Sequence, residues 1–459
     1  MVGHRMHDGT EKELVDLASQ LVERARALGA QVAEATARSG WELSARVRLG
    51  ETELVEEAGH RSAALRVMRD DRVALTSTSD LSPDGIARCV EDALALAELS
   101  EPDPLAAPAD ASLHARVPYP ELDLYDPATD AVDADQAILH ARTAEGAALG
   151  FDPRITLSEG GSFSRTSASW AMALSNGFVG ATRGSYASVM VVPVAEDEGG
   201  KRRRGAYWSA KRHLADLEAD VEVGEEAARR TLKKLGARKV ATGEAPVVFD
   251  ADAARSILGS FAGCVLGGAI WRKSSYLCER EGTRVASDRV TIVDDPLLLR
   301  GPGSRPFDGE GLPSVRTTVV ESGVLRTFLC DSYAARKLGR ASTASASRSG
   351  GSVSASTTNF VLEPGSLTPD ALIRSTERGL YVTEMMGFGF NAVTGDFSRG
   401  AAGFWIEKGE FAFPVSEVTI SSNLGTMLEG IDAIANDLDV KTSIAAPTFR
   451  VANMVISGS

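Results

Sequence analysis

The C-terminal half of the chain contains the stretch VTEMMGFGFNAVTGDFSRGAAGFW, residues 382–405. It holds five glycines, and glycine permits tight turns and the close approach of one backbone to another. Short strand-like runs with Gly and Pro between them surround this stretch, from Pro246 to the C-terminus. The pattern predicts a β-rich C-terminal domain over residues 240–459, interrupted by one helix at about 251–268.

The first hundred residues show a different pattern. Apolar residues recur at helical spacing between Leu14 and Leu28, and apolar and polar residues then alternate from Trp41 to Leu49. The first pattern is typical of an amphipathic helix and the second of a half-buried strand. Ser82-Pro83 opens a second helix, with serine as the cap and proline in the first turn. These elements predict an N-terminal domain of helices and an antiparallel sheet over residues 1–105.

Five prolines between residues 101 and 120 indicate a stiff, non-helical linker. Beyond it, a helix at about 132–148, a hairpin at Asn176-Gly177 and a helix at 221–235 predict a middle α+β domain over residues 120–236. The expected fold class is therefore α+β throughout, with the β-rich part last. The run 342–356 consists mostly of Ser, Ala and Gly, and this low complexity predicts a mobile loop.

Composition narrows the class of protein. The 459 residues include 43% apolar and 24% charged side chains, as in an ordinary globular protein. A net charge of -14 disfavours binding to nucleic acid and to anionic membranes. The four cysteines form no CxxC pair, and we find neither a secretory signal nor an apolar run long enough to span a membrane. We expect a cytoplasmic protein with no nucleic-acid and no membrane partner.

Histidine is confined to the first half of the chain. The six histidines are His4, His7, His60, His114, His140 and His213. The β-rich half therefore cannot build a His-ligated catalytic zinc or a Ser-His-Asp triad from its own residues. His60 follows Glu56 and Glu57, but HExxH chemistry needs two histidines on one helical face. We interpret His60 as a turn residue.

The stretch 382–405 closely resembles the C-terminal signature of the TldD/PmbA family. Further similar segments are 159–163, 272–274, 306–311, Thr358-Asn359 and Asn436-Asp437. The resemblance runs from about residue 30 to the end of the chain. It implies a cytosolic zinc peptidase, built from two related subunits, that acts on unfolded or small peptides. In this family the TldD-type subunit carries an HExxxH motif and a late cysteine as zinc ligands, and the TldE (PmbA) branch has lost them.

The resemblance also assigns positions to the lost ligands. Gly259 and Ser260 stand where the His-Glu of the motif is expected, Cys264 where the second His is expected, and Ala446 near the late cysteine. We call these four residues the motif positions. Gly and Ala offer no side-chain donor, Ser is a poor general base, and a single Cys is most often a small buried apolar residue. The resemblance thus implies the TldE/PmbA branch, with no catalytic residue and no metal in this chain and zinc expected in the partner subunit.

The resemblance suggests a set of residues for the subunit interface or a peptide channel. These candidates are Thr358, Asn359, Gly395, Asp396, Ser398 and Arg399. Arg399 either pairs with a carboxylate across an interface or holds Asp396 within the chain.

Three functions remain open from the sequence. The first is a non-catalytic subunit that assembles with an HExxxH-containing TldD-type subunit and acts on unfolded or small peptides. The second is a stand-alone peptide-binding protein without enzymatic activity. The third is an independent hydrolase that uses Ser260 or Cys264, although no base lies nearby in the sequence.

Overall fold

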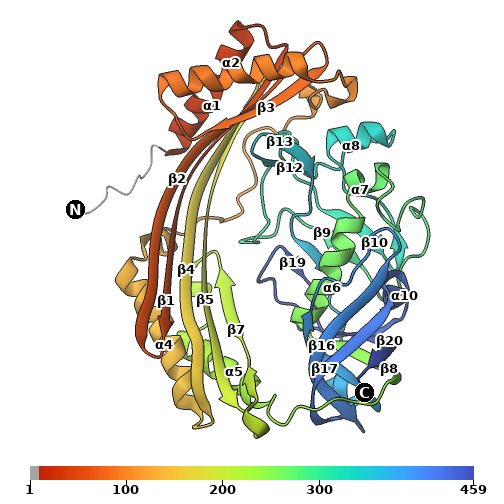
Figure 1. Cartoon of the computed structure of the whole chain (residues 1–459). Helices are drawn as coiled ribbons and strands as arrows, with labels where there is room; N and C mark the ends of the chain where they lie inside the picture. Colours follow the sequence, from red (N-terminus) through yellow and green to blue (C-terminus); the bar gives the residue numbers. More distant parts are fainter. Residues whose placement is uncertain (1–9, 459) are drawn as a thin grey trace.

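The computed structural model describes residues 10–458 and shows two bodies that face each other (Figure 1). A long, curved antiparallel sheet with helices at both ends forms one body. The second body combines shorter strands with a helix at its centre. Helices and strands are mixed in this way along the chain, which confirms the predicted α+β fold class.

The long sheet has the strand order β3-β2-β1-β4-β5-β6, with β7 paired to β5. Its strands are β1 (Val32–Arg48), β2 (Glu51–Arg69), β3 (Arg72–Thr78), β4 (Ile155–Leu174), β5 (Val179–Glu196), β6 (Arg202–Arg204) and β7 (Tyr207–Lys211). The central pair, β1 and β4, is in register from Glu34 opposite Leu174 to Val47 opposite Gly161. Segments on either side of the proline-rich linker therefore share one sheet.

The prediction that His60 is a turn residue is wrong. His60 lies within β2, opposite Gly40 of β1. The turn of this hairpin falls at Leu49 and Gly50, both of which have positive φ. The hairpin is longer than its polar sequence suggests, because residues 51–61 stay exposed although they pair with β1.

Helices cover the long sheet near its two ends. They are α1 (Thr10–Ala27), α2 (Pro83–Leu99), α3 (Pro127–Ala131), α4 (Ala134–Phe151) and α5 (Asp220–Leu232). The first two bury Leu14, Leu21 and Val90 against the sheet, whereas α4 and α5 enclose a separate core that includes Phe163. The predicted cap of α2 is confirmed, since Ser82 Oγ accepts a hydrogen bond from the Gly85 amide.

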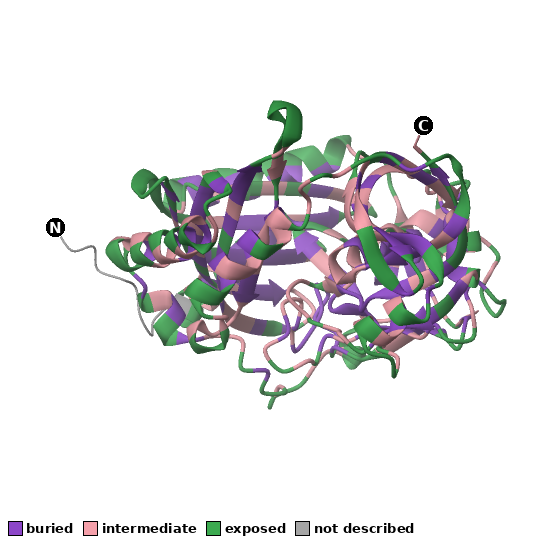
Figure 2. Ribbon diagram, turned by 90° about the horizontal axis from the view of Figure 1, so that it is seen from below, coloured by how far each residue is buried: buried purple, intermediate pink, exposed green. Residues whose placement is uncertain are grey.

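The second body is built on a sheet of order β17-β16-β15-β8-β20-β18, in which β17 also pairs with β20. This pairing closes the sheet into the ring visible near the C-terminus in Figure 2. The strands are β8 (Gly243–Phe249), β15 (Arg378–Met386), β16 (Asp396–Glu407), β17 (Glu410–Asn423), β18 (Ile431–Ile434) and β20 (Phe449–Ser457).

A smaller sheet of order β11-β10-β9-β14-β19 lies beside the ring. Its strands are β9 (Ile292–Asp294), β10 (Thr317–Glu321), β11 (Val324–Leu325), β14 (Phe360–Leu362) and β19 (Ile444–Ala445). The short helices α7 (Gly267–Trp271), α8 (Ser332–Lys337), α9 (Pro369–Arg374) and α10 (Leu424–Glu429) complete this body.

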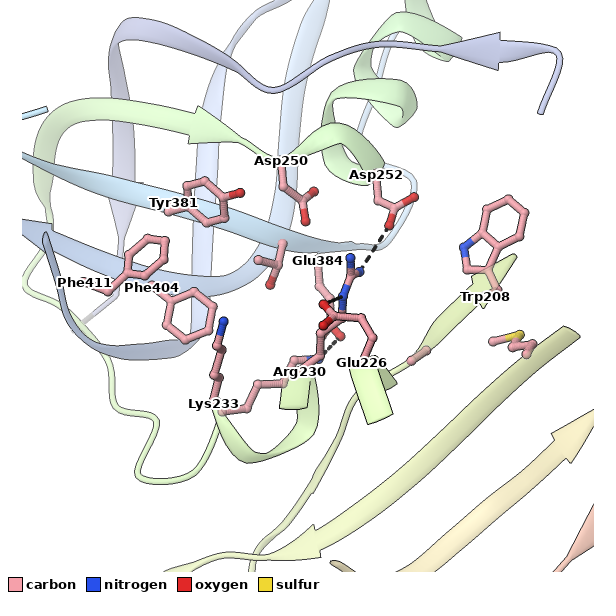
Figure 3. Close-up of a pocket in the computed structure, with 14 residues that line it drawn as sticks. Trp208, Glu226, Arg230, Lys233, Asp250, Asp252, Tyr381, Glu384, Phe404 and Phe411 are labelled. Carbon is pink, nitrogen blue, oxygen red and sulfur yellow. Dashed lines mark hydrogen bonds and ion pairs between the residues drawn. The ribbon is translucent and has the colours of Figure 1, made fainter. Parts of the chain in front are cut away.

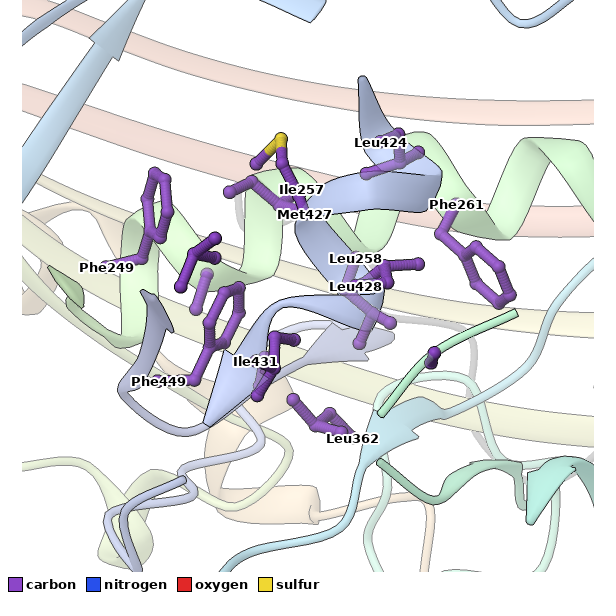
Figure 4. Packing of buried hydrophobic residues seen from close by; sticks show 14 of the residues in the cluster. Phe249, Ile257, Leu258, Phe261, Leu362, Leu424, Met427, Leu428, Ile431 and Phe449 are labelled. Atoms are coloured by element: carbon purple, nitrogen blue, oxygen red, sulfur yellow. The ribbon is translucent and has the colours of Figure 1, made fainter. Parts of the chain in front are cut away.

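The helix α6 (Ala251–Cys264) forms part of the largest apolar core of the protein (Figure 4). Ile257, Leu258 and Phe261 are buried there, and α10 contributes Met427 and Leu428. The single helix predicted at 251–268 is in fact two helices, because the chain leaves α6 at Cys264 and α7 starts at Gly267.

The predicted mobile loop at 342–356 is wrong in its central part. Residues 346–349 and 352–355 form the hairpin β12–β13 (Ala346–Ser349 and Ser352–Ala355). Arg348 of this hairpin is buried and reaches β1, where its Nη2 donates to Glu34 Oε2 at 2.7 Å. This ion pair links the hairpin to the other body, and the Ala346 amide, which donates to Asp308, holds it within its own body. No helix within residues 10–458 is long and apolar enough to cross a membrane.

Candidate functional site

Helix α6 carries three of the four motif positions. Asp250 caps its start and accepts a hydrogen bond from the Ala253 amide at 2.8 Å, so the helix follows directly from β8. A Cβ atom on Gly259 would lie 3.7 Å from Cδ1 of Ile444 in β19. Since β19 leads directly into Ala446, the structure brings the helical positions and the C-terminal position into one region.

The side chains at these positions do not fit a zinc ion. The Ser260 hydroxyl donates to the Ser256 carbonyl at 3.3 Å, and the Cys264 thiol donates to the Ser260 carbonyl at 3.4 Å. Burial raises the pKa of Cys264 to about 11, which disfavours the thiolate that would bind a metal or attack a substrate. Gly259 and Ala446 offer no side-chain donor. These side chains therefore support no reaction step through zinc in this chain.

The rest of the described chain offers no replacement for these ligands. Residues 10–458 contain no group of three or more His, Cys, Asp or Glu side chains placed to hold a metal ion. His4 and His7 lie outside the described residues.

Arg399 of β16 contacts the helix that carries the motif positions. Its Nη1 donates to the Ser256 hydroxyl of α6 at 2.8 Å, and its buried Nε finds no hydrogen-bond partner in the described part of the chain. Asp396 accepts hydrogen bonds from Thr394 at 2.7 Å and from Asn423 at 3.4 Å. The alternative in which Arg399 holds Asp396 is wrong, because no ion pair joins these two residues in the described structure.

The other predicted candidates divide into two groups. Gly395 has φ of +80°, and a Cβ there would lie 2.9 Å from the Asn423 side chain, so this turn requires glycine. Ser398 is exposed and exchanges a hydrogen bond with Ser421 at 3.0 Å. Thr358 and Asn359, in contrast, are buried.

Both buried candidates are bonded within the chain. The Thr358 amide donates to Asp294 at 2.6 Å, and the Asn359 side chain donates to Ser304 Oγ at 2.8 Å. Their positions fit a structural role. Ser256 was not singled out from the sequence, although its position four residues before Ser260 places both on one face of a helix.

Three family models match the chain along most of its length. The PmbA/TldA metallopeptidase domain 1 matches residues 33–97, the central domain residues 127–235, and the C-terminal domain residues 242–458. The long sheet, the closed C-terminal sheet and these matches define a multi-domain protein of a metallopeptidase family.

Individual relatives identify that family. The chain is 38% identical to metalloprotease PmbA of Escherichia coli O157:H7 over 416 residues, which cover 91% of this chain and 90% of the relative. It is 37% identical to the metalloprotease PmbA homolog of Haemophilus influenzae, with 98% and 97% covered. The chain belongs to the PmbA/TldD family.

Solved structures share the whole fold. A candidate modulator of DNA gyrase from Bacteroides thetaiotaomicron superposes with a TM-score of 0.91 at 29% identity, covering 99% of this chain and 100% of that one. TldE from Thermococcus kodakarensis superposes with a TM-score of 0.84 at 21% identity, covering 96% and 100%, which shows the likeness of fold alone.

Proposed function

We propose that this chain is the non-catalytic subunit of a two-subunit zinc metallopeptidase that degrades or processes unfolded or small peptides. The zinc ion belongs to an HExxxH-containing TldD-type subunit, and this chain supplies chamber wall and peptide contacts. The complex works in the cytoplasm, without a nucleic-acid or membrane partner. The observation that carries the proposal is the chemistry of the motif positions. Three of these positions lie in α6 and the fourth follows β19, and none of the four side chains suits zinc.

An open strand edge supports assembly with a second subunit. Residues 51–61 of β2 are all exposed, and β3 pairs with β2 only from Ala63 to Arg69. Within residues 10–458, the outer edge of β2 is therefore unpaired over this stretch, with Leu54 and Val55 exposed beside it. Natural proteins cover or pair such edges, because unprotected ones promote aggregation. We assign this edge to the contact with the TldD-type subunit.

The loop between β15 and β16 supports a contact on the second body. In this loop Phe388 is fully exposed and Val393 is 56% exposed, and Met386 at the end of β15 is 51% exposed. Exposed apolar side chains grouped on one loop are typical of binding surfaces. The loop leads directly into Gly395 and Arg399, so the predicted candidates on β16 adjoin an apolar contact area.

A stand-alone peptide-binding protein is the alternative function. The same β2 edge would then bind an extended peptide through main-chain hydrogen bonds, without any enzymatic partner. The two functions differ in whether the TldD-type subunit or an extended peptide contacts the β2 edge.

Reconstitution decides between them. We would purify this chain and the HExxxH-containing paralogue from the same genome, and run each alone and mixed on a size-exclusion column. Every peak is then assayed on an unfolded protein substrate. The proposal predicts one mixed species that carries the peptidase activity. Separate elution, with activity of the paralogue unchanged by this chain, would contradict it and favour the stand-alone protein.

A further inference from the structure

A cavity of about 330 Å³ lies between helix α5 and the closed sheet, at the start of α6 (Figure 3). Its walls come from β5, β7, α5, α6, β15, β16 and β17 and from residues next to them. None of the candidates predicted from the sequence lines it. The cavity is therefore separate from the motif positions, although α6 contributes residues to both.

One wall of the cavity is aromatic. The rings of Tyr381 and Phe411 lie 5.0 Å apart in an edge-on arrangement, and those of Phe404 and Phe411 are also 5.0 Å apart. The Trp208 side chain lines the cavity from β7. Such a wall suits the flat or apolar body of a small molecule.

Most charges that line the cavity are neutralised within the chain. Arg230 pairs with Glu226 at 2.9 Å and with Asp252 at 3.5 Å (dashed in Figure 3). Lys234 pairs with Glu384. Three of the four acidic side chains in the lining thus have a cation of their own.

Asp250 is the acidic residue that lacks one. No ion pair to it occurs within residues 10–458, and Oδ1 accepts the helix-capping hydrogen bond from Ala253. A carboxylate has room for several more donors. Figure 3 shows the carboxyl group beside the aromatic wall, with the Tyr381 hydroxyl directed toward it.

The surroundings of Asp250 leave its charge under-compensated. Burial raises its pKa to about 7, the Ala253 amide and Arg230 oppose this shift, and the nearby carboxylates of Asp252 and Asp437 add to it. A cation bound at Asp250 would supply the missing compensation.

We propose that this cavity binds a small molecule with a primary ammonium group on an aromatic or large apolar body. The ammonium group contacts the Asp250 carboxylate, and the body packs on Tyr381, Phe404 and Phe411. An amine or an amino-acid derivative meets this description. The site lies within one chain, so it does not depend on the partner subunit proposed above.

The test uses this chain alone and a matched pair of probes, 2-phenylethylamine and 2-phenylethanol. Isothermal titration at pH 8 should show binding of the amine and at least tenfold weaker binding of the alcohol, which has the same ring but no charge. Asp250→Asn should weaken the amine at least tenfold. Asparagine is an equally good helix cap, so this variant keeps the fold. Asp370→Asn, at an exposed aspartate in the first turn of α9 and outside the cavity lining, is the control and should bind the amine as well as the unaltered chain.

The pH dependence of the unaltered chain gives a test that needs no variant. The ammonium group requires ionised Asp250, and the ionised fraction rises about tenfold from pH 6 to pH 8 around a pKa of about 7. Affinity for the amine should rise by about the same factor, and should be flat in Asp250→Asn. The proposal is overturned if the alcohol binds as well as the amine, if affinity does not change with pH, or if the amine shows no binding up to about 10 mM.

Discussion

Arg348 of the β12–β13 hairpin and Glu34 of β1 form a buried ion pair, with Nη2 and Oε2 2.7 Å apart. Arg66 of β2 also contacts Glu34, at 3.1 Å. The main chain of the hairpin accepts a further hydrogen bond, from Arg38 to the Arg348 carbonyl at 2.8 Å. These contacts join the second body to the long sheet. Arg348 and Glu34 are 314 positions apart in the sequence.

Replacement of Arg348 tests this connection. Arg348→Met leaves Glu34 buried with one cation instead of two, and removal of one partner of a buried pair costs about 3–5 kcal/mol. We expect the free energy of unfolding in urea to fall by an amount near the lower end of this range, because Arg66 remains. Arg326→Met, in an exposed pair with Glu321, is the control and should change stability by less than about 1 kcal/mol. Equal effects of the two variants would show that the Arg348–Glu34 pair stabilises the fold no more than an exposed pair does.

The buried carboxyl group of Glu310 should make the free energy of unfolding depend on pH. Burial, followed by the nearby Asp308 carboxylate, raises the pKa of Glu310 to about 7, and its carboxylate accepts from the Ser332 amide and hydroxyl at 2.8 Å. Between an unfolded pKa of about 4.3 and the folded value, the folded state holds a proton that the unfolded state has lost. Glu310 therefore contributes stability below about pH 4.3 that is lost as pH rises to 7, with a slope of at most about 1.4 kcal/mol per pH unit.

The isosteric variant Glu310→Gln isolates this contribution. Chemical denaturation of both chains between pH 4.5 and 8 should show that the variant gains stability relative to the unaltered chain as pH rises. A constant difference across this range would show that Glu310 does not titrate there.

Charges placed on the open β2 edge test the assembly surface. We expect Leu54→Glu with Val55→Glu to weaken binding of the TldD-type subunit at least tenfold, because the acidic side chains would be desolvated in the interface. Both positions are exposed, at 44% and 40%, so the stability of the isolated chain should change by no more than about 0.5 kcal/mol. Leu99→Glu, at an 83% exposed position on α2, is the control and should bind normally. Analytical ultracentrifugation of the mixtures measures the affinity of each variant for the TldD-type subunit. Unaltered assembly of the double variant would show that this part of β2 is not in the interface.

Variants of Arg399 and Ser256 distinguish a role of Arg399 in the complex from a role in the fold of this chain. Ser256→Ala removes one hydrogen-bond partner of Arg399 and should cost about 1 kcal/mol of stability without loss of peptidase activity in the complex. We expect Arg399→Ala to lower that activity at least tenfold, since it also removes the charge that adjoins the exposed loop. Similar loss of stability and full activity in both variants would mean that Arg399 serves only to hold α6 against β16.

Local patterns predicted much of the fold, and long-range contacts account for the errors. The capped start of α2 and the strand alternation in β1 follow from neighbouring residues, so the sequence contains the information directly. The hairpin at 346–355 and the strand position of His60 depend on partners in Glu34 and Gly40, which no local pattern reveals. The motif positions were found through the family resemblance. The contact between Arg399 and Ser256 required the packing of β16 on α6.

Two complexes, each with substitutions in only one subunit, show which subunit carries out peptide cleavage. One complex combines this chain, carrying Ser260→Ala and Cys264→Ala, with the unaltered TldD-type subunit, and the other combines the unaltered chain with a TldD-type subunit whose HExxxH glutamate is replaced by glutamine. Initial rates of peptide cleavage by the two purified complexes are then compared. We expect near-normal activity of the first complex and loss of at least a hundredfold in the second, because the general base belongs to the partner. Activity that survives in the second complex and disappears in the first would show that the catalytic residues belong to this chain and not to its partner.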